Sequence, residues 1–341
     1  MNRDRRRFLR VAGSSVVVGA GSALTRSARA AQAPQAPPEP VSFPNVANPL
    51  EAPVEVIAAG YVWTEGPVWV GGDQGHLLFS DVPANAIYIW DGKRATPFLA
   101  PSGYQGFPLP ATLREAGSNG LAIGRGGLLL ADSGTRAIVR VDLATRQRTI
   151  LAESFQDKRF NSPNDLVLAR SGDIYFTDPP FGLTNTQKST LRELTYTGVF
   201  RLTPSNQVHL IADNLSPNGI ALSPDNRTLY VTDTSGWVAI DLDASDAATE
   251  QRPFVRTESV GGARGDGMKA DLAGNIWTSG RGGIYVFSPK GEHIGFAPIA
   301  GRVSNCAFGP GRYLYVTNDT QVVRGRIRAD FPGGAPIAAS A

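Results

Sequence analysis

Six short segments of the chain each lead with a carboxylate or an amide side chain, and these six side chains are the first candidates for chemistry. The leading residues are Glu65, Asn119, Asn164, Asn218, Asp266 and Asn305. They recur at spacings of 54, 45, 54, 48 and 39 residues. Brought together, they would form an all-oxygen ligand set, which suits a hard cation such as Ca²⁺ with its roughly 6–8 oxygen ligands.

Each leading residue is followed by a short run, strand-like in most copies, then a turn and a second run that ends in a polar residue. Repetition at this period, with 38 glycines and little helical periodicity, predicts short strands joined by turns. The expected fold is an all-β, six-bladed β-propeller over residues 54–328. Each segment would begin the inner strand of a blade, so the leading side chains would meet at a central opening.

The carboxylates of Glu65 and Asp266 would balance the charge of a divalent ion. Without a cation, two carboxylates in a narrow and partly desolvated opening would repel each other at high cost. The alternative is that the Asn and Asp residues merely cap turns, but Glu at the first position is a weak turn former. The residues favour a divalent metal site, with Ca²⁺ preferred and Mg²⁺, Mn²⁺ or Zn²⁺ as alternatives.

Further polar residues are candidates for contacting a substrate at this opening. Asp132 and Asp178 end the second runs of two copies, and Asn119 and Asn164 lead the same two copies. Asp178 begins an Asp-Pro-Pro turn, so it either fixes a carboxylate near the site or only makes the turn. The three histidines lie outside the repeated positions, which gives little support to a Ser-His-Asp triad or a histidine-rich metal site.

Residues 1–30 have the features of a twin-arginine export signal. Arg5, Arg6 and Arg7 precede an apolar stretch over residues 11–24, and small residues suited to cleavage follow at 28–30. The alternative is a basic amphipathic N-terminus that stays attached. A cleaved signal predicts a periplasmic protein that engages the Tat export machinery and has no stable membrane anchor afterwards.

The remaining chain divides by composition into a linker, a domain and a tail. Residues 31–53 are rich in Ala, Pro and Gln and predict an extended linker, and residues 329–341 form a C-terminal tail. The formal charge of +3 comes from the Arg-rich residues 1–30. The rest is slightly acidic, so no nucleic-acid partner is expected. The single cysteine, Cys306, excludes an intrachain disulfide, and its place in an inner-strand copy predicts packing.

Two long insertions interrupt the repeat, at residues 103–110 and 182–198. Long loops on a rigid scaffold often cover a site. The alternative is a pair of tolerated surface excursions, and the sequence does not favour either.

The ordered motifs resemble the SMP-30/gluconolactonase family, and specifically its bacterial gluconolactonase-like branch. The matching text is Thr64-Glu65-Gly66-Pro67-Val68-Trp69, Ser118-Asn119-Gly120-Leu121, Asn161-Ser162-Pro163-Asn164-Asp165, Tyr175-Phe176-Thr177-Asp178-Pro179-Pro180-Phe181-Gly182, Pro217-Asn218-Gly219, Asp266-Gly267-Met268-Lys269 and Trp277. The resemblance implies a divalent cation held by Glu65, Asn164, Asn218 and Asp266. It also implies hydrolysis of a sugar lactone or a related cyclic ester.

Within that resemblance, Asp266 is the candidate to accept a proton from the attacking water, and Asn164 would also orient the substrate. One departure bears on the substrate, because Ser133 stands where members of this branch often carry His. Two alternatives stay open: a metal-dependent esterase or phosphoesterase on the same scaffold, and a non-catalytic periplasmic ligand-binding propeller.

Overall fold

The computed structural model describes residues 41–334, and this part of the chain is an all-β propeller, as the sequence predicts. Three short 3₁₀ helices occur between the strands: η1 (Thr186–Lys188), η2 (Thr257–Val260) and η3 (Pro310–Arg312). No helix within residues 41–334 has the length and apolar character needed to cross a membrane. The predicted export signal, residues 1–30, lies outside the described residues.

Four sheets contain four strands each, and in every one the strands follow chain order from the inside outward. The first two are β2 (Thr64–Val70), β3 (His76–Asp81), β4 (Ala86–Trp90), β5 (Ala95–Leu99) and β6 (Ser118–Gly124), β7 (Gly127–Asp132), β8 (Ala137–Val141), β9 (Arg148–Ala152). The next two are β12 (Leu166–Leu168), β13 (Ile174–Asp178), β14 (Gly198–Leu202), β15 (Val208–Ala212) and β16 (Ile220–Leu222), β17 (Thr228–Asp233), β18 (Gly236–Leu242), β19 (Ala248–Arg256). A two-stranded ribbon, β10 (Ser154–Phe155) and β11 (Lys158–Arg159), precedes β12.

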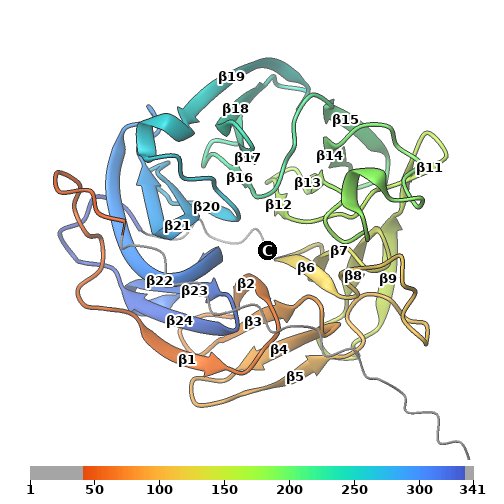
Figure 1. Cartoon of the computed structure of the whole chain (residues 1–341), viewed down its shortest axis with the longest axis horizontal. Coiled ribbons are helices and arrows are strands. Elements are labelled where there is room, and N and C mark those ends of the chain that lie inside the picture. The colour runs from red at the N-terminus through yellow and green to blue at the C-terminus, as the bar shows by residue number, and fades with distance from the viewer. Residues whose placement is uncertain (1–40, 335–341) are drawn as a thin grey trace, which may run out of the picture. The chain divides into compact units, whose positions relative to one another are not determined.

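A fifth sheet has six strands in the order β1-β24-β23-β22-β21-β20. Its strands are β1 (Glu55–Ala59), β20 (Met268–Ala270), β21 (Ile276–Phe287), β22 (His293–Phe308), β23 (Tyr313–Asn318) and β24 (Gln321–Arg326). The long strand β22 changes partner along its length: residues 293–302 pair with β21, and residues 303–308 pair with β23. Figure 1 shows the sheets around a central axis, with β2, β6, β12, β16 and β20 innermost.

The first strand of the domain pairs with the last. β1 lies antiparallel to β24, with Glu55 opposite Arg324 and Val56 opposite Val323. This pairing covers an edge that would otherwise expose unpaired backbone groups. It joins the first strand of the described chain to the last.

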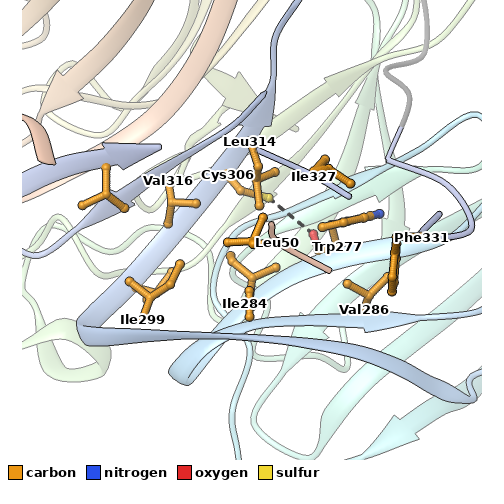
Figure 2. Close-up of a cluster of buried hydrophobic side chains, with 13 residues drawn as sticks. Leu50, Trp277, Ile284, Val286, Ile299, Cys306, Leu314, Val316, Ile327 and Phe331 are labelled. Atoms are coloured by element: carbon orange, nitrogen blue, oxygen red, sulfur yellow. Dashed lines mark hydrogen bonds between the residues drawn. The ribbon is translucent and has the colours of Figure 1, made fainter. Parts of the chain in front are cut away.

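Apolar side chains fill the spaces between neighbouring sheets. Figure 2 shows a cluster within the six-stranded sheet, in which Trp277, Ile284, Cys306 and Leu314 pack against Leu50. The Cys306 thiol is fully buried, donates weakly to the carbonyl oxygen of Trp277 at 3.6 Å, and has its pKa raised to about 12 by burial. The expected packing role of Cys306 is therefore confirmed.

Packing extends beyond residues 54–328 on both sides. Ala47 forms a bridge with Gly295, and the ring of Phe43 meets that of Phe296 edge-on at 5.0 Å. At the other end, Phe331 is buried against Trp277, with ring centroids 5.5 Å apart. Residues 41–53 and 329–334 thus pack against the sheet formed by β21 and β22.

Candidate active site

Five of the six leading residues lie at the starts of the inner strands or just before them, and Asn305 lies near the start of the part of β22 that pairs with β23. Glu65, Asn119 and Asn305 lie within β2, β6 and β22, whereas Asn164, Asn218 and Asp266 precede β12, β16 and β20 by two residues. Glu65, Asn119, Asn164 and Asn305 are buried, and Asn218 and Asp266 are half-buried. The repeat therefore places one polar side chain at the same end of each inner strand.

Hydroxyl groups on the second strands donate hydrogen bonds to the backbone carbonyls of three leading residues. Ser80 Oγ donates to the carbonyl oxygen of Asn119 at 2.9 Å, and Thr177 Oγ1 donates to that of Asn218 at 2.6 Å. Thr232 Oγ1 donates to the carbonyl oxygen of Asp266 at 2.9 Å. In each case the second strand of one sheet fixes the leading residue of the next sheet.

The sequence analysis missed these hydroxyls, although the signal is visible in the chain. Ser80, Thr177 and Thr232 each stand immediately before the Asp that closes the second run. The corresponding residue of β7 is Ala131, which has no hydroxyl. There the backbone N–H of Gly120 donates to the carbonyl oxygen of Asn164 at 2.7 Å and links the neighbouring inner strands directly.

A buried polar network connects several of the side chains at the opening. The Asn305 amide donates to Glu65 Oε2 at 3.3 Å and to Asp165 Oδ2 at 3.4 Å. Lys269 Nζ in turn donates to Asn305 Oδ1 at 3.1 Å, which orients the amide. Asp165 and Lys269 were not predicted, and each lies within a few residues of a leading residue, Asn164 or Asp266.

Neighbouring carboxylates at the opening disfavour the ionisation of Glu65 and Asp266. Burial, followed by the charge of Asp266, holds the pKa of Glu65 well above its usual range. Burial, followed by the charges of Asp165 and Glu115, raises the pKa of Asp266 to about 7, while a hydrogen bond from the Asn218 side chain acts in the opposite direction. The site therefore crowds buried carboxyl groups whose full ionisation would be favoured by a compensating cation.

This arrangement fits a hard cation. Within residues 41–334, no three His, Cys, Asp or Glu side chains are placed to hold a metal ion by themselves. The predicted ligands instead mix the carboxylates of Glu65 and Asp266 with the amide oxygens of Asn164 and Asn218. The charge of Asp266 raises the pKa of Glu65, and a hydrogen bond from the Asn218 side chain lowers that of Asp266. Asn164 precedes β12 by two residues, as Asn218 precedes β16. Crowded carboxylates with amide oxygens are a donor set suited to a divalent hard ion.

The carboxylates of Asp178 and Asp132 are directed to neighbouring loops. Asp178 accepts the backbone N–H groups of Asn161 and Ser162, both at 2.7 Å, and burial raises its pKa to about 7. Asp132 accepts the backbone N–H of Thr135 at 2.8 Å and forms an ion pair with Arg148. Both carboxylates thus hold turns in place, the second of the two roles considered for Asp178.

The residues that follow the first long insertion pair with the start of the second. Leu113 forms a bridge with Leu183, and the backbone N–H groups of Arg114 and Glu115 both donate to the carbonyl oxygen of Gly182, at 2.8 and 3.2 Å. The N–H of Thr184 also donates to the carbonyl oxygen of Thr112 at 2.9 Å. Residues 111–115 and 182–184 therefore form one joined loop structure.

A separate cavity of about 450 Å³ lies further along the inner strands. Its walls are mainly the apolar residues that follow the leading positions, such as Leu121, Leu166 and Ile220, and it contains none of the leading residues. Lys269 lines this cavity and also bonds Asn305. The lysine thus stands between the apolar cavity and the carboxylate network.

The fold and site together define an all-β propeller with carboxylate and amide oxygens gathered around its axis. The family model described as "SMP-30/Gluconolactonase/LRE-like region" matches residues 63–320. The chain belongs to this family, as its motifs indicate.

Relatives and solved structures agree with the assignment. The gluconolactonase of Zymomonas mobilis is 45% identical over 298 residues, which cover 82% of each chain. A gluconolactonase from Xanthomonas campestris matches with a TM-score of 0.69 and 30% identity, covering 86% of this chain and 100% of that one. Regucalcin from Agrobacterium tumefaciens, described as a calcium-binding protein, shares the fold with a TM-score of 0.65 at 20% identity, over 86% and 99% of the two chains.

Proposed function

We propose that this protein is a lactonase that opens a sugar lactone by adding water to its ester bond. The observation that carries the proposal is the gathering of Glu65, Asp266 and Asn218 at the opening, within a network of buried polar groups. The 45% identity to a gluconolactonase over 82% of each chain supports the choice of substrate class.

We propose further that the enzyme depends on a divalent cation held by Glu65, Asn164, Asn218 and Asp266, with Ca²⁺ as the preferred ion. Bound there, the ion would polarise the lactone carbonyl and stabilise the negative charge that develops on its oxygen. The crowding of buried carboxylates supports this proposal, because a cation would offset their mutual repulsion.

The side chains of the site transfer the proton, orient the substrate and position the Glu65 carboxylate. Asp266 accepts the proton that the attacking water loses and returns it to the ring oxygen as the ester C–O bond breaks, which yields the hydroxy acid. Asn164 orients the substrate through its amide group. Asn305, itself oriented by Lys269, keeps the Glu65 carboxylate in place.

Two proposals concern the protein around this site. We infer that the six-stranded sheet comprises two blades, which would give six in total, because the two parts of β22 pair with different strands. We also propose that the protein reaches the periplasm by the twin-arginine route, on the basis of Arg5, Arg6 and the small residues at 28–30.

Substrate comparison with the purified protein tests the lactonase proposal. Acid release from glucono-1,5-lactone would be followed in a pH-stat, with spontaneous hydrolysis subtracted, beside an aryl ester and a phosphotriester. We expect the lactone to have the highest kcat/KM. Faster turnover of either alternative substrate would assign the site to an esterase or phosphoesterase, and binding without turnover would assign it to a ligand-binding propeller.

A further inference from the structure

An arginine and a tryptophan are stacked beside the opening, and the mechanism above uses neither of them. The guanidinium carbon of Arg302 lies 4.6 Å from the centre of the Trp63 ring. Arg302 is exposed and Trp63 is half-buried, so solvent reaches the guanidinium. A guanidinium stacked on an indole is attracted to the face of the ring. These two residues are called the Arg302–Trp63 pair below.

Hydrogen bonds fix the backbone on both sides of the Arg302–Trp63 pair. The N–H of Asp319 donates to the carbonyl oxygen of Arg302 at 3.0 Å, and the N–H of Thr64 donates to that of Asp319 at 2.8 Å. The N–H of Trp63 donates to the buried carboxylate of Asp81 at 3.1 Å. The turn between β23 and β24 therefore joins the backbone of Arg302 to that of Thr64, next to Trp63.

The Arg302–Trp63 pair lies close to the carboxylate network of the proposed active site. Trp63 precedes Glu65 by two residues, and Arg302 precedes Asn305 by three. Glu65 and Asn305 are themselves bonded, with the Asn305 amide 3.3 Å from Glu65 Oε2. Three residues of chain span at most about 11 Å, so the backbone of the pair lies within that distance of the network. A charged group at the far end of a six-carbon lactone bound at the network would be within reach of the guanidinium.

The positive charge of Arg302 has no carboxylate partner in the described part of the chain. None of the ion pairs within residues 41–334 includes Arg302 or Arg281. Arg281 is also exposed, and it lies directly opposite Arg302 in the pairing of β21 with β22. Like charges directly opposite each other across two strands repel. An anion bound at this place would offset the repulsion.

We propose that the Arg302–Trp63 pair binds the phosphate or carboxylate group of an anionic sugar lactone, and that the enzyme prefers such lactones to neutral ones. This inference rests on the proposed lactonase function. A guanidinium presents its N–H donors in a planar fork that matches two oxygens of a phosphate or a carboxylate. The Trp63 ring covers one face of the guanidinium, and the donors at its edge stay free. A neutral lactone offers this fork only hydroxyl and ester oxygens, which form weaker hydrogen bonds with it.

Two ring-matched pairs of substrates test the preference and distinguish the two anions. The phosphate is tested with 6-phosphoglucono-1,5-lactone against glucono-1,5-lactone, and the carboxylate with glucaro-1,4-lactone against glucono-1,4-lactone. We expect at least one anionic lactone to exceed its neutral partner in kcat/KM by about tenfold, chiefly through a lower KM, because a charge-assisted hydrogen bond is gained. Raising the salt concentration from about 0.05 M to about 0.5 M should reduce this advantage, since the guanidinium is exposed.

Variants of Arg302 assign the effect to this side chain. Arg302→Gln should abolish the advantage of the anionic lactone and leave kcat/KM for its neutral partner within about threefold of wild type. Arg302→Lys keeps the charge but loses the planar fork, so part of the advantage should remain. The control is Arg170→Gln, which makes the same change in net charge at an exposed arginine beyond the opposite end of β12. It should retain the full advantage.

Several outcomes would overturn the inference while the lactonase itself stands. They are equal kcat/KM for the neutral and anionic members of both pairs in wild type, and an advantage that survives Arg302→Gln. Equal losses on neutral and anionic lactones in Arg302→Gln would exclude a role specific to the anion, and an equal loss in Arg170→Gln would reduce the effect to net charge. A wild type inactive on all four lactones would overturn the proposed function and this inference with it.

Discussion

Replacing Asp266 by Asn is expected to stabilise the metal-free protein and to impair its activity. Burial and the charges of Asp165 and Glu115 raise the pKa of Asp266 from 3.8 to about 7. Between these pH values the folded state keeps a proton that the unfolded state has lost. The free energy of unfolding of the metal-free protein therefore falls as pH rises from about 4 to about 7.

The magnitude follows from the size of the pKa shift. Roughly three pKa units at about 1.36 kcal/mol each correspond to about 4 kcal/mol by pH 8.5. The substituted asparagine side chain cannot ionise but keeps an oxygen that accepts the hydrogen bond from Asn218, so up to about this amount should be regained. With an unfolding entropy of about 0.6 kcal/mol/K for a domain of this size, the gain corresponds to about 7 °C in Tm.

Differential scanning calorimetry in excess chelator, at several pH values from 5 to 8.5, measures this effect. Asp266→Asn should melt well above wild type at pH 8.5, and the difference should shrink toward pH 5. The control is Asp213→Asn, an exposed carboxylate next to β15, which should behave as wild type. Equal melting temperatures for wild type and Asp266→Asn at pH 8.5 would refute the reasoning.

The same variant separates stability from catalysis. With metal saturating, turnover of the lactone should fall by about 10²–10⁴-fold, which is the usual contribution of a positioned general base. Metal content measured on the same sample distinguishes a lost base from a lost ion. A metal-loaded variant that works at the wild-type rate would exclude Asp266 as the proton acceptor.

Three further predictions concern the ligands, the hydroxyls and the processed chain. Glu65→Gln should weaken Ca²⁺ binding in calorimetric titration, because it removes one of two compensating charges at constant shape; unchanged affinity would remove Glu65 from the ligand set. Thr232→Val should cost about 1–3 kcal/mol in urea unfolding, because the Gly219 N–H loses an acceptor at 2.7 Å and the Asp266 carbonyl loses a donor, and an unaltered midpoint would contradict a positioning role for the hydroxyl. N-terminal sequencing of protein from the periplasmic fraction should find a start close to Ala31, and an intact Met1 there would count against a cleaved signal.

Much of the fold and the position of the site were accessible from the sequence because both depend on a repeated local pattern. The polar residue at the start of each inner strand recurs in the chain, and symmetry around the axis makes the leading residues converge. For both the fold and the site, the local sequence pattern determines which distant residues come together.

The remaining features depend on contacts that a repeat does not encode. Glu115 lies between the first insertion and β6, and its backbone N–H donates to the carbonyl oxygen of Gly182 in the second insertion. The carboxylates of Asp132 and Asp178 stand at strand ends near the opening, yet their oxygens bind local backbone N–H groups and an arginine. The direction of a side chain at a strand end is set by the turn beside it, which the strand pattern does not determine.

The central claim, a lactonase that depends on one cation at the opening, is tested most directly by metal titration of activity. Wild-type protein freed of metal by chelation would receive increasing Ca²⁺ while the rate of glucono-1,5-lactone hydrolysis is recorded. We expect a rate near that of buffer at the start, a rise to a plateau at about one equivalent, and no such plateau for Glu65→Gln. Full activity in the metal-free wild type would contradict the account.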